Sequence, residues 1–218
     1  MQIKIFQDFI DIIRGKKKLF YSGIKISNNG VGNIIKTPKK ICGNLSIVIN
    51  GNNNSVIIDN IKYFQGLIYI GTIDCNVNNS SVYIGEATTS NGIILWILED
   101  DSKVHIGENC MFSSDIYITC SDHHTIIDAE GNIQNIGKNI HIGNNVWVGR
   151  NVTIGKNVSI GNNSVVGMSS VVTSKTPFPS NCVIAGNPAK VVKENINWSR
   201  LRPKQWIAEA NKKSSFGG

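Results

Sequence analysis

The side chains of this chain that are best suited to proton transfer are its four histidines, His105, His123, His124 and His141. Imidazole changes its protonation state at about pH 6.5, so a histidine can remove the proton of a hydroxyl while the oxygen attacks another group. His123 and His124 follow Asp122 within a polar segment, Thr119 to Asn135, that interrupts a regular aliphatic pattern. We therefore expect a loop at residues 119–135 that carries a general base.

A metal site is the alternative use of these histidines. His105, His123 and His141 are spaced by eighteen residues, so a regular fold with that period would align them in a column. Stacked histidines can bind zinc. The polar segment interrupts this spacing, however, and we therefore expect no metal.

Three of the histidines precede a six-residue repeat that extends from Ile136 to Thr173, and His141 lies within it. An aliphatic residue begins each unit, at Ile136, Ile142, Val148, Ile154, Ile160, Val166 and Val172, and glycine follows the first six. A second residue suited to the interior comes four positions later, at Ile140, Val146, Val152, Val158, Ser164 and Ser170, and the residue before it is Asn or Ser. Neither a helix, with a period of 3.6, nor a strand, with a period of 2, explains a period of six.

This repeat predicts an all-β fold, a parallel β-helix. In such a fold no unit buries its apolar face alone, and stacking completes the core. Asn and Gly tolerate left-handed backbone angles, so we expect them at the corners. Three six-residue sides would form a triangular coil, and coils would stack about 4.8 Å apart.

The block resembles the hexapeptide-repeat acyltransferases, whose β-helix is left-handed and whose usual donor is acetyl-CoA. The segment SDHHTIID is similar to their motif Asp-x-His-(Ser/Pro/Thr)-Ile, which implies that His124, rather than His123, is the general base and that Asp122 belongs to the site. VWVG is similar to their Val-Trp-(Ile/Val)-Gly motif, which implies that Trp147 lies beside the reacting groups. A zinc-binding class shares this fold, but its His-x-x-x-x-His spacing is missing here.

The same resemblance implies where the cosubstrate would bind. The family's track for the pantetheine arm corresponds to Gly149, Arg150, Gly167 and Met168, and the nucleotide end of CoA to Thr173, Lys190 and Lys193. Arg150 and Met168 replace small residues, so we expect their side chains to point away. The two lysines would pair with the phosphates that CoA carries at its nucleotide end.

The resemblance is strongest to members that acetylate surface sugars such as capsule, O-antigen or sialic-acid glycans. It implies an acetyl-CoA-dependent O-acetyltransferase that acts as a homotrimer, with each active site between two subunits. Two alternatives remain open from the residues: an N-acetyltransferase of an amino-sugar nucleotide on the same fold, and a non-catalytic or metal-binding β-helix. No GxGxxG or Walker loop is present, which argues against a nucleotide-triphosphate enzyme.

Three segments are predicted along the chain. Residues 1–35 form a cap segment with a short helix over Phe6 to Ile13 and a basic cluster after it, residues 36–190 form the β-helix, and residues 191–218 form a C-terminal helix and tail. We expect both helices to cap open ends of the β-helix. Contact of the N-terminal basic helix with a membrane surface is left open as a second interpretation.

Composition narrows the partners and the compartment. The 218 residues carry a net charge of +7 and 17% charged residues, and the basic residues cluster near the two ends, so we expect an anionic polysaccharide to be the better acceptor. No nucleic-acid partner is expected. Five cysteines without a CxxC pair favour a reducing compartment, and with no signal-peptide pattern at the start we expect a cytoplasmic protein.

Overall fold

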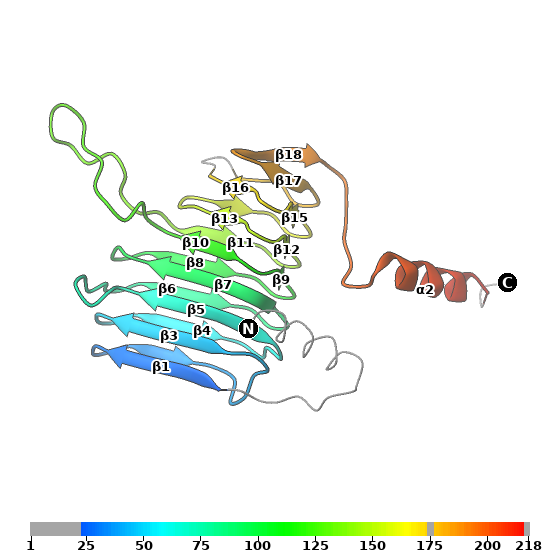
Figure 1. Cartoon of the computed structure of the whole chain (residues 1–218), viewed down its shortest axis with the longest axis horizontal. Helices are drawn as coiled ribbons and strands as arrows, with labels where there is room; N and C mark the ends of the chain where they lie inside the picture. The colour runs from blue at the N-terminus through cyan, green and yellow to red at the C-terminus, as the bar shows by residue number, and fades with distance from the viewer. Residues whose placement is uncertain (1–22, 174–176, 216–218) are drawn as a thin grey trace.

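The structure, a computed structural model, describes residues 23–173 and 177–215 (Figure 1). Its strands follow one another around a common axis, and each pairs in parallel with strands of the neighbouring coils, apart from the antiparallel pair β17 and β18. The predicted all-β parallel β-helix is therefore confirmed, and it is of the left-handed type. The predicted helix over residues 6–13 and the basic cluster after it lie outside the described residues.

The N-terminal coils are flat and contain two strands each. One face is built from long strands, β1 (Ile24–Asn29), β3 (Leu45–Asn50), β5 (Phe64–Ile70) and β7 (Thr89–Ile97). The other face begins with shorter strands, β2 (Ile34–Lys36), β4 (Ser55–Ile58), β6 (Ser81–Ile84) and β8 (Lys103–Ile106). Because Ile24 pairs with Leu45, the coils begin twelve residues before residue 36, the boundary expected from the sequence.

The cross-section changes from two strands to three after β7. The first part of β7 pairs with β9 (Met111–Phe112), and its last part pairs with β10 (Ile116–Thr119). Asp115, with φ of 60°, forms the corner that separates β9 from β10, whereas the corresponding part of β7 continues straight through Gly92. Ile84 pairs with Ile106, 22 residues further on, so this coil is wider than the eighteen-residue coils that follow.

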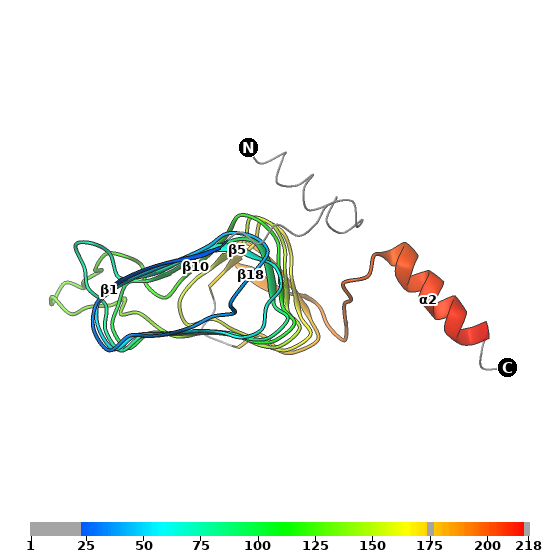
Figure 2. The same ribbon diagram turned by 90° about the horizontal axis from the view of Figure 1, so that it is seen from below.

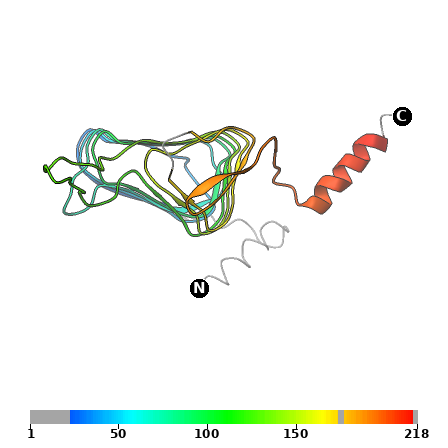
Figure 3. The same cartoon turned by 90° about the horizontal axis from the view of Figure 1, so that it is seen from above.

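Three flat sides then continue to the C-terminal end. They contain, in chain order, β11 (Ile140–Ile142), β12 (Trp147–Val148), β13 (Thr153–Ile154), β14 (Ser159–Ile160), β15 (Val165–Val166), β16 (Val171–Val172) and β17 (Val183–Gly186), which pairs with β18 (Ala189–Lys193). Viewed along the axis, successive coils superimpose (Figures 2 and 3). Trp147 pairs with Val165, and Val165 with Val183, so the eighteen-residue coil is confirmed.

The core consists of the two aliphatic positions of each repeat. Ile142, Val148, Ile154, Ile160, Val166 and Val172 are fully buried, as are Ser164, Ser170 and Cys110. Ile136 was expected to begin this series, but 60% of its surface is exposed. It lies in the loop that precedes β11, so the stacked repeat begins at Ile140.

Asparagine and glycine have different roles in the corners. The left-handed backbone angle falls on Asn145, Asn151, Asn157 and Asn163, with φ between 54° and 62°, and on Ser169. The repeat glycines do not have positive φ; at Gly149 and Gly161 glycine is required because the backbone of the next coil is too close for a side chain. A Cβ at Gly161 would lie 2.4 Å from the backbone nitrogen of Ser180. The prediction that glycine supplies the corner angle was wrong for these positions.

The C-terminal segment returns along one corner of the β-helix. Ile196 exchanges hydrogen bonds with Asn181, the Trp198 Nε1–H donates to the Asn145 carbonyl (2.6 Å), and the Arg200 guanidinium donates to the Cys110 carbonyl (2.7 Å). Arg200, one of the basic residues near the C-terminal end, therefore fastens this segment.

Helix α2 (Pro203–Ser215) follows and projects away from the β-helix (Figure 1). Trp206 and Ile207 are 57% and 58% exposed, so the expectation that this helix caps the open end was wrong. Within the described residues, no helix has the length and apolar character that a membrane span requires.

Candidate active site

The polar segment expected to carry chemistry is a loop that leaves the β-helix between β10 and β11 (Figure 1). Its ends are held together where the Lys138 N–H donates to the Cys120 carbonyl (3.0 Å). Further out, Ile127 and Ile133 form an antiparallel bridge, so the loop closes into a narrow hairpin. The loop is therefore attached to a rigid corner, which is the arrangement that can position a catalytic side chain.

His124 lies at the root of this loop with its main chain bonded on both sides. Its N–H donates to the Asp122 carbonyl (2.8 Å), and its own carbonyl accepts a hydrogen bond from the Asn135 side chain (2.7 Å). The side chain is exposed, and it lines an open pocket together with Glu99, His123, Thr125, Ile133, Asn135 and Ile136. The backbone is thus fixed while the imidazole remains accessible to a substrate.

Asp122 does not use its carboxylate to orient the His124 ring. Its Oδ2 accepts hydrogen bonds from Lys156 Nζ (2.6 Å) and from Asn135 Nδ2 (3.0 Å). These bonds, above all the one from Lys156, lower the pKa of the carboxyl below its ordinary value, so the ion pair persists at neutral pH. Asp122 is consequently connected to His124 through its backbone carbonyl and through the Asn135 amide.

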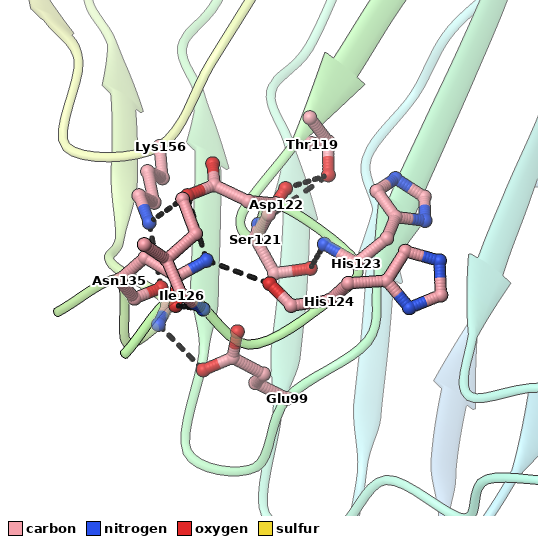
Figure 4. Close-up of polar contacts among 10 residues, drawn as sticks. Glu99, Thr119, Ser121, Asp122, His123, His124, Ile126, Asn135 and Lys156 are labelled. Carbon is pink, nitrogen blue, oxygen red and sulfur yellow. Dashed lines mark hydrogen bonds and ion pairs between the residues drawn. The ribbon is translucent and has the colours of Figure 1, made fainter. Parts of the chain in front are cut away.

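His123 points to the same side as His124, away from the polar cluster of Asp122, Asn135 and Lys156 (Figure 4). It has φ of 67°, and its Nε2 is 2.8 Å from the hydroxyl of Tyr117. Its ring also lies 5.4 Å from the ring of Trp96. His123 is therefore held against the face of the β-helix, in contrast to the free ring of His124.

Glu99, Asn135 and Lys156 are residues of this site that the sequence did not single out. The Gly137 N–H donates to the Glu99 carboxylate, and Lys156 Nζ also donates to the Asn135 carbonyl (2.6 Å). Lys156 comes from the corner one coil above the loop, and Glu99 from the coil below. The only sequence signal of Glu99 and Lys156 was their charge at an expected corner, and charge at such a position usually means solvent exposure.

Trp147 is at a different corner from His124. It is 39% exposed, and its ring lies 6.0 Å from that of Trp198 in the returning C-terminal segment. Seen along the axis, the histidine loop and the C-terminal segment leave from opposite ends of the cross-section (Figure 2). The structure of one chain therefore does not bring Trp147 and His124 together.

The residues expected to hold CoA follow the edges of the last coils. A Cβ at Gly149 would lie 2.7 Å from the Met168 nitrogen, and one at Gly167 would touch Ala185, so these glycines form a smooth strip of backbone. Met168 is 74% exposed, and the exposed Arg150 pairs with Asp115 at 3.7 Å. Exposed side chains are also found at Thr173, Lys190 and Lys193.

The expected histidine column forms only in part. His105 and His141 stack with centroids 4.9 Å apart, and Tyr83 continues the column on the other side of His105. Burial, and then the neighbouring His141, lower the pKa of His105. His123 is absent from the column because its segment loops out. The described residues contain no group of three or more His, Cys, Asp or Glu side chains that could bind a metal.

A parallel β-helix of six-residue repeats with a histidine-bearing loop at one corner defines the class of hexapeptide transferases. The family described as bacterial transferase hexapeptide (six repeats) matches residues 139–174. The solved structure of the polySia-specific acetyltransferase NeuO is 34% identical, with a TM-score of 0.65 over 88% of this chain and 96% of that one. The polysialic acid O-acetyltransferase OatWY is 32% identical, with a TM-score of 0.61 over 89% and 100%.

A curated relative, the polysialic acid O-acetyltransferase of Escherichia coli O1:K1 / APEC, is 38% identical over 138 residues. The match covers 63% of this chain and 44% of that protein, so the chain matches less than half of its length. The chain belongs to the hexapeptide-repeat acyltransferase family.

Proposed function

We propose that this protein is an acetyl-CoA-dependent O-acetyltransferase whose acceptor is a hydroxyl of a sialic-acid polymer. Three relatives that are 32% to 38% identical are named for polysialic acid. The observation that carries the proposal for this chain is His124, an accessible imidazole on a backbone fixed by Asp122 and Asn135. The same imidazole could serve an N-acetyltransferase, so the choice of a hydroxyl acceptor rests on the names of the polysialic acid O-acetyltransferases.

In the proposed reaction, His124 accepts the proton of the sugar hydroxyl as the oxygen attacks the thioester carbonyl. A carbon–oxygen bond forms, the carbon–sulfur bond breaks, and the proton passes from His124 to the departing CoA thiolate. A backbone N–H stabilises the oxyanion of the intermediate. Lys156, Asp122 and Asn135 maintain the loop so that His124 does not have to be ordered during the reaction.

We propose that the active site is completed by a neighbouring subunit of a homotrimer. The histidine loop and the C-terminal segment, whose Trp198 packs on Trp147, lie at opposite ends of one cross-section (Figure 2), so a site that uses both His124 and Trp147 requires two chains. The pantetheine arm would follow the backbone strip at Gly149 and Gly167, and the CoA phosphates would lie near Lys190 and Lys193. Because acetyl-CoA is a cytosolic metabolite, we place the reaction in the cytoplasm.

The test is mass spectrometry of sialic-acid oligomers incubated with acetyl-CoA and the protein. The parent protein should add acetyl groups, and His124→Ala should abolish transfer while CoA binding and folding remain near normal, because the ring lies outside the core. His123→Ala should keep much of the turnover. An active His124→Ala variant would refute the assignment of the base.

The anionic nature of the acceptor can be tested separately. Acidic and neutral oligomers of equal length should be compared at low and high salt, since exposed charge contacts weaken with ionic strength. We expect higher catalytic efficiency on the acidic oligomer and a decrease with salt. Equal efficiencies without a salt effect would show that the basic residues near the chain ends play no part in acceptor binding.

A further inference from the structure

Aromatic side chains gather on the outer face of the larger sheet, next to the histidine loop. They are Tyr69 of β5, Trp96 of β7, Tyr117 of β10 and His123 of the loop, and we call them the aromatic platform. Tyr69 pairs directly with Trp96 across the two strands. The three ring-bearing strand residues are half-buried, so each ring is anchored to the β-helix and still reaches its surface.

The platform is continuous with the pocket of His124. The rings of Tyr69 and Trp96 have centroids 5.3 Å apart, and those of Trp96 and His123 are 5.4 Å apart. His123 in turn lines the same pocket as His124. Since β5, β7 and β10 are successive strands about 4.8 Å apart, the platform extends about 10 Å from the pocket along the axis of the β-helix.

The orientation of the Trp96 ring differs from that of the rings in the other outer aromatic column. Tyr83, His105 and His141 stack with interplanar angles of 17° and 13°, so each ring covers the face of the next. In the aromatic platform, Trp96 is tilted by 59° from Tyr69 and by 45° from His123, whereas Tyr117 and His123 are nearly parallel, with an interplanar angle of 15°. Tilted rings cover each other less and leave part of their faces available to a ligand.

The orientation of Trp96 leaves its indole N–H without a hydrogen bond among the described residues, which is energetically unfavourable. Its Nε1 is buried and has no hydrogen-bond partner in the described part of the chain. A buried indole N–H usually finds an acceptor, and leaving one unpaired is unfavourable. A side chain placed at the expense of its own hydrogen bond is a candidate for a role beyond packing.

We infer that the aromatic platform binds the sugar residues of the acceptor next to the one that is acetylated. This inference rests on the proposed function and extends it to a second subsite. The C–H faces of a sugar ring or of its N-acyl group are apolar and pack on aromatic faces, while its polar edges remain in water. Because the platform joins the pocket without interruption, a glycan whose hydroxyl reaches His124 would place its neighbouring sugars on Trp96 and Tyr69.

The experiment compares Trp96→Ala and Trp96→Phe with the parent on sialic-acid oligomers of increasing length. We expect Trp96→Ala to raise KM for a hexamer about tenfold, corresponding to the loss of one ring contact, and to reduce the advantage of the hexamer over the dimer. Trp96→Phe should have a KM for the hexamer close to that of the parent, because phenylalanine keeps a ring face. Tyr83→Ala, which removes a half-buried outer ring from the other sheet, is the matched control and should leave KM unchanged.

Saturation-transfer NMR of the hexamer without acetyl-CoA supplies a second measurement, in which we expect signal transfer that Trp96→Ala weakens. An equal hexamer KM in Trp96→Ala and the parent would overturn the subsite and leave the proposed function standing. A parent that transfers no acetyl group to any glycan would overturn the proposed function itself. If Trp96→Ala lowers the mass in sedimentation analysis, a second copy of the chain covers this face, and the inference is wrong.

Discussion

Replacing Asn135 should show whether the order of the loop root contributes to activity, because Asn135 holds the His124 backbone and takes no part in proton transfer. Its Nδ2 donates to the His124 carbonyl (2.7 Å) and to Asp122 Oδ2 (3.0 Å), and its Oδ1 accepts from the Ile126 N–H (2.7 Å). Asn135→Ala removes all three bonds but leaves the imidazole and the β-helix core untouched. Activity should therefore fall because the loop root is ordered for less of the time.

The size of the effect follows from those three contacts. All are at the surface, where water replaces a lost partner, so each contributes about 0.5 kcal/mol, the lower end of the usual range. A total of about 1.5 kcal/mol corresponds to a decrease of about tenfold in kcat/KM. The thermal midpoint should change little, because the loop lies outside the stacked coils.

The assay is steady-state acetyl transfer to a sialic-acid oligomer, with thermal unfolding measured in parallel. Asn132→Ala is the matched control, since among the described residues the Asn132 side chain bonds only to Asp128, in the tip of the same loop. We expect the control to lie within about twofold of the parent. If the two variants lose the same activity, or if Asn135→Ala loses none, the loop root does not position His124.

Three further outcomes are expected. Sedimentation analysis should give three times the 23.8 kDa mass of the chain, and a monomer at micromolar concentration would exclude a site shared between subunits. Replacing Lys190 and Lys193 by Ala should raise KM for acetyl-CoA several-fold with a smaller change in kcat; an unchanged KM would mean that neither lysine meets the CoA phosphates. Gly161→Ala should destabilise the fold by about 2 kcal/mol, because its Cβ would meet backbone at 2.4 Å, whereas at Gly155 the nearest atom is a side-chain methyl at 3.2 Å. Equal unfolding midpoints for these two variants would contradict the close-approach explanation.

The sequence determined the C-terminal coils almost completely. A period of six that is maintained in two aliphatic positions and one asparagine position is compatible with one arrangement, and the core residues from Ile140 to Val172 lie where the repeat predicts. The reason is local: each unit carries its own corner, as the φ values of Asn145 and Asn151 show, so the pattern can be read without knowledge of distant contacts. The position of the histidine loop was readable for the same reason, as an interruption of the period.

The N-terminal coils could not be assigned from sequence because their strands run through positions where the later coils turn. In β7, nothing local indicates that one strand faces both β9 and β10. Ile136 was misassigned because it keeps the period by coincidence while lying in the loop. Whether an aliphatic residue is buried there depends on the coil beneath it.

Only the tertiary structure decided how the site is assembled. Lys156 and Glu99 reach the loop from the coils above and below it, and such contacts between coils leave no signature in sequence spacing. The use of Arg200 to fasten the C-terminal segment depends likewise on a carbonyl ninety positions away. The repeat in the sequence specifies the β-helix, whereas contacts between side chains of different coils determine which residues form the site.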